Sequence, residues 1–61
     1  MDKHLYTLYE VEPGGNWIEV SKWATAEEAL TARSLAFKEQ DEELLTGEKN
    51  TYCNYIILLE Y

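Results

Sequence analysis

Apolar and aromatic side chains dominate three segments of the chain, residues 4–11, 17–23 and 51–61. In the second segment the apolar side chains alternate with polar ones, a pattern typical of a half-buried β-strand. Between the first two segments, residues 12–16 include Pro13, Gly14 and Gly15, which favour a tight turn. The pattern therefore predicts a β-hairpin and, at the other end of the chain, a third strand.

The hydrophobic period changes to that of a helix between Thr25 and Gly47. Thr25, followed three residues later by Glu28, predicts a capping box, in which the hydroxyl accepts a hydrogen bond from one free backbone N–H and the carboxylate reaches back for another. Gly47 is expected to end the helix after about 20 residues, or roughly 30 Å. The residues predicted to share its apolar face are Ala26, Ala29, Leu30, Phe37 and Leu44, with Ala36 at the margin.

These elements predict a single α+β domain that spans residues 1–61, with the element order ββαβ. A right-handed crossover through the helix places the third strand parallel to the second, and its expected position is beside the first. The sheet is therefore expected to be three-stranded and antiparallel with the order 2-1-3. One long helix is expected to pack on one of its faces.

Apolar side chains outnumber the positions that one helix covers, because the first and third strands are apolar on both faces. An exposed apolar patch on a small protein usually marks an interface, although tyrosine also tolerates a hydroxyl group in water. We therefore expect a homodimer, formed through the open sheet face or the edge of the third strand. The residues expected at this self-association interface are Trp17, Trp23, Tyr55, Ile57, Leu59 and Tyr61.

The composition limits how such a short chain is stabilised. A 61-residue chain with one cysteine and one histidine can form neither an internal disulfide nor a Cys/His zinc site. Domains of this size bury only about 60% of their unfolded surface, so self-association or a partner protein is the expected additional source of stability. No stretch approaches the roughly 20 apolar residues that cross a bilayer, and we expect a cytoplasmic protein.

No residue pattern in the chain predicts catalysis, a metal or a cofactor. His4 and Cys53 are the only histidine and cysteine, and neither an oxyanion loop nor a nucleophile motif accompanies them. The acidic run at residues 39–43 lacks the alternating ligands and central glycine of a calcium loop. The turn at residues 12–16 lacks the lysine and the following helix of a phosphate-binding loop. We therefore expect no enzymatic activity and no cofactor.

Twelve acidic and five basic residues give the chain a formal net charge of −7. This charge repels nucleic acid and anionic membranes, so direct binding to either is not expected. A rigid array of carboxylates suits the basic groove of a nucleic-acid-handling protein, although acidic runs are more often solvated faces. The residues expected to bind such a partner are Glu27, Glu28, Glu39, Asp41, Glu42 and Glu43.

In size, charge and compactness, the chain resembles the small acidic proteins that phages make to block host restriction and CRISPR systems. The resemblance implies a non-enzymatic inhibitor of a basic, nucleic-acid-handling protein. A broader version of this prediction is an adaptor that binds a basic partner. The alternative is a small regulatory domain that binds an apolar or aromatic ligand between Trp17, Trp23 and Tyr55.

Overall fold

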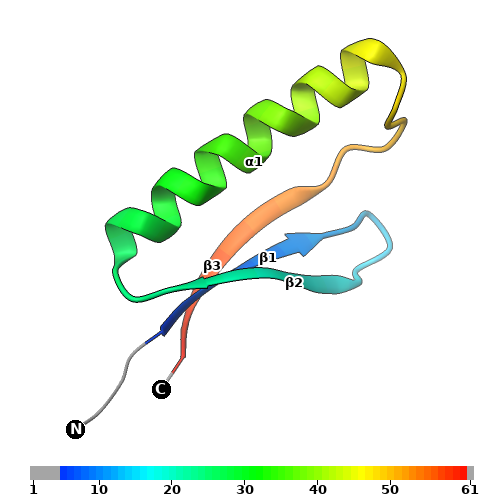
Figure 1. Cartoon of the computed structure of the whole chain (residues 1–61). Helices are drawn as coiled ribbons and strands as arrows, with labels where there is room; N and C mark the ends of the chain where they lie inside the picture. The colour runs from blue at the N-terminus through cyan, green and yellow to red at the C-terminus, as the bar shows by residue number, and fades with distance from the viewer. Residues whose placement is uncertain (1–4, 61) are drawn as a thin grey trace, which may run out of the picture.

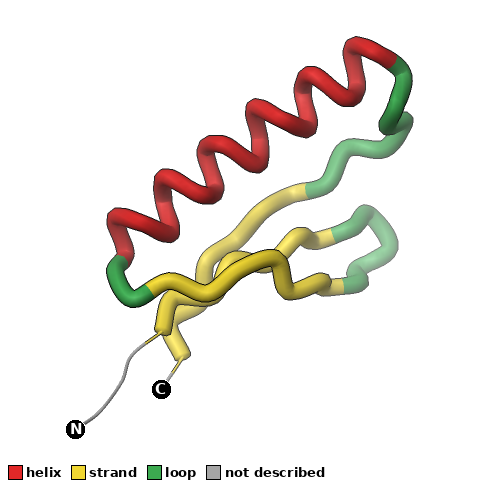
Figure 2. The backbone as a smooth tube through the Cα atoms, viewed as in Figure 1, coloured by secondary structure: helices red, strands yellow, loops and turns green. Residues whose placement is uncertain are grey.

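The computed structural model describes residues 5–60 and contains the predicted elements in the order ββαβ (Figure 1). Strands β1 (Leu5–Val11) and β2 (Trp17–Trp23) form a hairpin, helix α1 (Ala26–Thr46) follows, and β3 (Asn54–Glu60) completes the sheet. The strand order is β2-β1-β3, and both pairs of neighbours are antiparallel. Because α1 lies against one face of this sheet, the predicted α+β fold is confirmed (Figure 2).

The hairpin turn uses the residues that the sequence indicates. The Glu12 amide donates a hydrogen bond to the Asn16 carbonyl at 2.9 Å, and the Gly15 amide donates one to the Glu12 carbonyl at 2.8 Å. Gly15 has a φ of 91°, a left-handed conformation that glycine adopts without the strain that a Cβ atom causes. The turn thus joins β1 to β2 without backbone strain.

Helix α1 begins and ends at the predicted capping residues. The Glu28 amide donates a hydrogen bond to the Thr25 hydroxyl at 3.2 Å, and Gly47 ends the helix with a φ of 84°. The second half of the capping box differs from the expectation, because the Glu28 carboxylate accepts a hydrogen bond from the Thr25 hydroxyl at 3.0 Å and not from a backbone N–H. The carboxylate still lies in the first turn, where the helix dipole favours negative charge.

The position of Leu8 decides which face of the sheet meets α1. Leu8 is 1% exposed and lies among residues of the helix and of β2. It pairs with Ile57 on β3 and with Ser21 on β2, and directly opposed residues share a face. Side chains alternate along β3 from this point. The helix-facing residues of β3 are Tyr55, Ile57 and Leu59, and those on the open side are Ile56, Leu58 and Glu60.

The helix meets the sheet along a narrower face than the sequence predicts. Ala29 is buried, as expected, but Leu30 is 46% exposed, and Gln40, a polar residue that is not among those predicted for the apolar face, is fully buried. Ala29 and Gln40 are eleven residues apart, which is about three helical turns and places them on the same side of α1. Leu30 is rotated away from that side by about 100°.

The Gln40 side chain joins α1 to the segment that enters β3. Its Nε2 donates a hydrogen bond to the Cys53 carbonyl at 2.9 Å, and its Oε1 accepts one from the Cys53 amide at 2.9 Å. One amide side chain thus satisfies both backbone groups of Cys53, as a neighbouring strand would. This Gln40–Cys53 pair fixes the C-terminal half of α1 relative to the sheet.

Candidate binding groove and acidic helix

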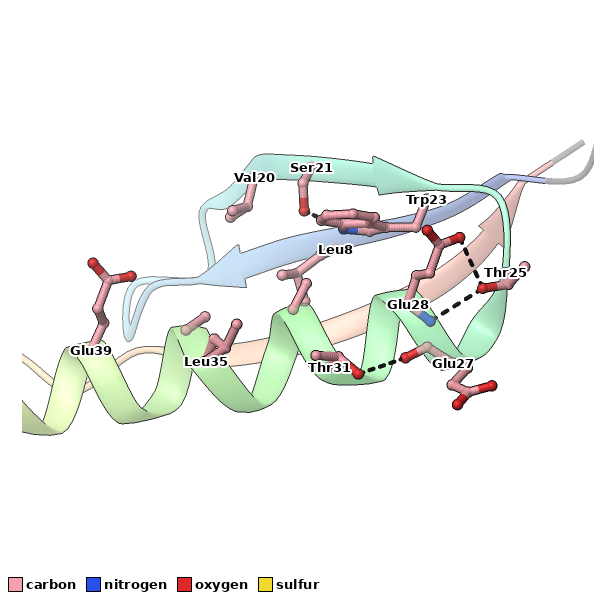
Figure 3. Close-up of a pocket in the computed structure, with 12 residues that line it drawn as sticks. Leu8, Val20, Ser21, Trp23, Thr25, Glu27, Glu28, Thr31, Leu35 and Glu39 are labelled. Carbon is pink, nitrogen blue, oxygen red and sulfur yellow. Dashed lines mark hydrogen bonds between the residues drawn. The ribbon is translucent and has the colours of Figure 1, made fainter.

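A groove lies between α1 and β2, on the helix-facing side of the sheet (Figure 3). Its volume of ≈490 Å³ falls within the range of about 300–1,000 Å³ that is typical of ligand pockets. Leu8 forms the floor, Val20 and Trp23 line the strand side, and Leu35 lines the helix side. Because Val20 and Leu35 are 48% and 58% exposed, the groove presents apolar surface without a partner.

A β-bulge in β2 shapes the strand side of this groove. Leu8 pairs with Ser21 and the next residue, Tyr9, pairs with Glu19, which leaves Val20 as an extra residue in β2. A bulge interrupts the alternation of side chains, and both Val20 and Ser21 line the groove. The alternation of the sequence gives no sign of this bulge.

Trp23 has a fixed orientation in the groove. Its indole Nε1 donates a hydrogen bond to the Ser21 hydroxyl at 2.7 Å. The ring lies between β2 and α1, close to Leu8 (Figure 3). Because the N–H group is satisfied within β2, the rest of the ring contributes only apolar surface to the groove.

Carboxylates line the helix side of the groove. Glu27, Glu28 and Glu39 contribute to its lining, whereas no described lysine or arginine does. Glu28 and Glu39 are eleven residues apart, so they are separated by about 16 Å along the axis of α1. The groove therefore combines an apolar floor with negative charge toward both ends.

The six acidic residues predicted to bind a partner are all exposed on α1. The ion pairs of the described residues join Lys22 to Glu19 at 3.5 Å and to Glu60 at 3.2 Å, and Lys49 to Glu10 at 3.6 Å. None of the six takes part in an ion pair within residues 5–60, so the fold leaves their charge unneutralised. These six residues are named the helix carboxylates: Glu27, Glu28, Glu39, Asp41, Glu42 and Glu43.

The predicted placement of Tyr55, Ile57 and Leu59 on the open face is wrong. All three lie on the helix-facing side, because β3 pairs with β1 in the register that sets Ile57 opposite the buried Leu8. Tyr55 is 8% exposed, and its ring packs edge-on against Phe37 of α1, with centroids 5.0 Å apart and an interplanar angle of 85°. Alternation groups residues into faces, but the aromatic contact with the helix decides which face is covered.

Trp17 and Trp23 lie on opposite sides of the sheet, although they are six positions apart in one strand. The extra residue Val20 reverses the alternation between them. Trp17 lies on the open face beside Tyr9, with ring centroids 5.5 Å apart, whereas Trp23 lines the groove. The structure therefore does not bring Trp17 together with Trp23 and Tyr55 as an aromatic ligand site. Tyr61, the last predicted interface residue, lies outside the described residues.

A polar cluster around Glu60 occupies the open face. The Glu60 carboxylate accepts hydrogen bonds from the Thr7 hydroxyl, from the Tyr9 hydroxyl at 3.0 Å and from the Lys22 ammonium group at 3.2 Å. The hydrogen bond from Thr7, followed by those from Tyr9 and Lys22, holds the pKa of Glu60 below its usual range. The hydrogen bonds to this carboxylate raise the pKa of Tyr9 and of Lys22. The cluster therefore joins the three strands across the face that α1 leaves open.

Sequence reasoning missed this cluster, although the sequence carries a signal for it. Glu60 is the only charged residue in β3, and Thr7 and Tyr9 alternate along the same side of β1. A lone carboxylate in an apolar strand is expected to find donors on the neighbouring strand. The cluster is thus structural, and the exposed apolar residues around it are Leu5, Trp17 and Leu58.

The structure does not test a pairing of Cys53 with His4, the one histidine of the chain. Cys53 is 3% exposed, and its backbone amide and carbonyl are both hydrogen-bonded to the Gln40 side chain. His4 lies outside the described residues. Among residues 5–60, no three His, Cys, Asp or Glu side chains are grouped as a metal site. No helix in this part of the chain combines the length and the apolarity that a bilayer crossing requires.

Protein-family models, curated proteins and solved structures were all compared with this chain, and none matches it. The two features that bear on function are the apolar groove and the helix carboxylates, which make no ion pair within residues 5–60.

Proposed function

We propose that this protein is a non-enzymatic interaction module, an inhibitor or adaptor that binds a basic partner protein through α1. The observation that supports this proposal is that the six helix carboxylates are exposed and make no ion pair within residues 5–60. Such a surface attracts a basic partner and accelerates encounter. The formal net charge of −7 acts in the same direction.

A partner that handles nucleic acid fits this surface best. Such proteins bind the phosphate backbone with lysine and arginine, and a rigid row of carboxylates competes for the same groups. The leading specific version is an inhibitor of a host restriction or CRISPR system, of the kind that phages make. The protein then acts in the cytoplasm by occupying a basic groove, without a cofactor.

The charge-reversal variant Asp41→Lys/Glu42→Lys is expected to weaken partner binding by about tenfold or more, because repulsion replaces attraction at two positions. The immobilised protein first captures its partner from a bacterial lysate, and the affinity of the purified partner is then measured at several salt concentrations. The matched control is Glu12→Lys/Glu48→Lys, which changes the net charge equally outside the helix. We expect the control to bind almost unchanged, and an equal response of the two variants contradicts the proposal.

We also propose that the protein is a homodimer, formed through the open sheet face or the free edge of β3. On the open face, Leu5, Trp17 and Leu58 are 36%, 50% and 43% exposed. Within the described residues, β3 pairs with β1 alone and its other edge has no backbone partner. An apolar strand edge of this kind is a site for pairing with a second chain.

Light scattering over a wide range of protein concentration is expected to give the mass of a dimer of 7.1 kDa chains. Leu58→Asp is expected to shift this mass to that of the monomer, because it places a charge on the open face. Leu45→Asp, on α1 at a position that is 88% exposed, is the control and is expected to leave the dimer intact. A monomeric mass for the unchanged protein at all concentrations contradicts this proposal.

A further inference from the structure

We infer that the groove between α1 and β2 is the docking site for a basic amphipathic helix of the partner protein. This inference rests on the proposed function and names the segment that is recognised. Apolar side chains of that helix enter between Val20, Trp23 and Leu35, and its lysines or arginines meet Glu28 and Glu39 toward the two ends of the groove.

The groove is formed before a partner arrives. Leu8, which forms its floor, is 1% exposed, and the hydrogen bond of 2.7 Å to Ser21 fixes the Trp23 ring. A preorganised site loses little conformational entropy on binding. Burial of Val20 and Leu35, which are 48% and 58% exposed, provides the hydrophobic driving force.

The charge of the groove selects a basic occupant. Glu27, Glu28 and Glu39 line it, with no described lysine or arginine among its lining residues. A second copy of this chain does not fit, because the one helix in its described part is α1, whose six helix carboxylates are repelled by this rim. A neutral small molecule fills the apolar floor but leaves the carboxylates without partners. A segment with apolar residues on one side and cationic residues beside them satisfies both features.

The geometry favours a helix over an added strand. The bulge at Val20 interrupts the regular edge of β2, and bulges at sheet edges oppose pairing with another strand. Glu28 and Glu39 are about 16 Å apart along α1, which corresponds to about three turns of a docked helix. Leucine-type residues at i, i+3 or i+4 and i+7 then face the groove, as in other helix-in-groove complexes.

The first test uses a synthetic helical peptide of leucine and lysine, in which the leucines form one stripe. A second peptide has the same composition in an order that disperses the leucines. Binding is followed by Trp23 fluorescence in a Trp17→Phe background. We expect the striped peptide to shift the emission to shorter wavelength and to bind at least about tenfold more tightly than the dispersed peptide. Equal affinities overturn the inference, because charge alone then accounts for binding.

The second test uses matched variants that locate the peptide. The first variant is Leu35→Gln, because Leu35 lines the groove. Its control is Leu30→Gln, because Leu30 is 46% exposed and lies outside the lining. Neither substitution changes the net charge. We expect Leu35→Gln to lower the affinity for the striped peptide about tenfold and Leu30→Gln to leave it unchanged. Likewise, Glu39→Gln is expected to weaken binding and its salt dependence more than Glu42→Gln, which lies off the groove. Equal responses within either pair overturn the inference.

The failure of this inference and the failure of the proposed function give different results. If Leu35→Gln has no effect on peptide binding, while charge reversal at Asp41 and Glu42 still prevents partner binding, the groove inference is wrong and the proposed function stands. If peptide binding depends on Leu35 but charge reversal leaves the partner bound, the proposed function is wrong and the groove site stands. Tighter binding of naphthalene than of the striped peptide, or loss of a dimer in Leu35→Gln, also overturns the inference.

Discussion

Replacement of Gln40 with leucine is expected to lower the free energy of unfolding by about 3 kcal/mol, because two buried backbone groups of Cys53 lose their hydrogen-bond partners. Gln40 is 0% exposed and Cys53 is 3% exposed, so water does not replace the lost amide. Each unsatisfied buried group costs about 1–3 kcal/mol, while leucine has a similar volume and leaves no large cavity. Denaturant unfolding, followed by circular dichroism and tryptophan fluorescence, measures the change.

The size of this effect is large relative to the stability of a short chain. A domain of fewer than 70 residues has a total stability of only about 3–5 kcal/mol, so Gln40→Leu is expected to leave no more than about 2 kcal/mol and to unfold a measurable fraction of the protein in buffer. Lys38→Leu is the matched control, because it places the same side chain at an exposed position of α1. We expect it to change the stability by less than about 0.5 kcal/mol. Equal effects of the two leucines show that the Gln40–Cys53 pair does not stabilise the fold.

Gln40→Glu tests the hydrogen bonding at the same position. An ionised carboxylate at this position still accepts the hydrogen bond from the Cys53 amide. It has no donor to replace Gln40 Nε2, which donates a hydrogen bond to the Cys53 carbonyl at 2.9 Å. A protonated carboxyl group satisfies both, so its folded pKa is expected to be raised by burial beside the carbonyl. The stability of this variant relative to the unchanged protein is therefore highest below the unfolded pKa of about 4.3 and is lost as pH rises through the raised folded pKa.

Two anchors hold α1 against the sheet, and the groove lies between them. Thr25 caps the start of the helix directly after β2, and Gln40 attaches its later turns to the segment before β3. The lining residues that α1 contributes to the groove run from Glu27 to Glu39, between these two points. Anchoring at both ends limits the movement of the helix side of the groove relative to β2. The Gln40–Cys53 pair, which does not itself line the groove, thus helps to hold the groove in the shape that the proposed peptide requires.

The elements and their order could be predicted because each has a local signal in the sequence. The capping residue Thr25, the stop at Gly47 and the glycine turn before β2 all act within a few residues of themselves. The choice of sheet face has no such signal. It depends on the packing of Phe37 against Tyr55, which are 18 positions apart in the chain. Val20 shows the same limit, because a bulge is decided by the partner strand as well as by its own.

The candidate site was predicted only in its charge. The helix carboxylates follow from an acidic run on a helix, so their exposure was foreseeable. The groove requires α1 and β2 to be placed side by side, and its bulged strand side reverses the expected alternation. Leu35 is not among the residues of the predicted apolar face, and it is the leucine that α1 contributes to the groove. Leu35 lies on the part of α1 that borders the groove, which explains why this leucine is exposed and does not pack on the sheet.

Replacement of Leu8 with alanine is expected to lower the free energy of unfolding by about 3 kcal/mol, within the range of about 2–5 kcal/mol for buried leucines. Leu8 is 1% exposed, and it lies in the central strand where α1, β2 and β3 meet. The loss has two parts, the transfer free energy of the removed methyl groups and the cavity that remains. Denaturant unfolding measures it, with trimethylamine N-oxide added if the variant is mostly unfolded in buffer.

Leu35→Ala is the matched control for Leu8→Ala, because it removes the same atoms from the other side of the same groove. Leu35 is 58% exposed, so its truncation leaves no buried cavity and is expected to lower the free energy of unfolding by less than about 1 kcal/mol. Equal losses at the two leucines contradict the packing of α1 over β1. A large loss at Leu8 alone shows instead that the floor of the groove supports the fold while Leu35 contributes little to it. An exposed leucine that adds little to stability is then free to serve binding, as the groove inference requires.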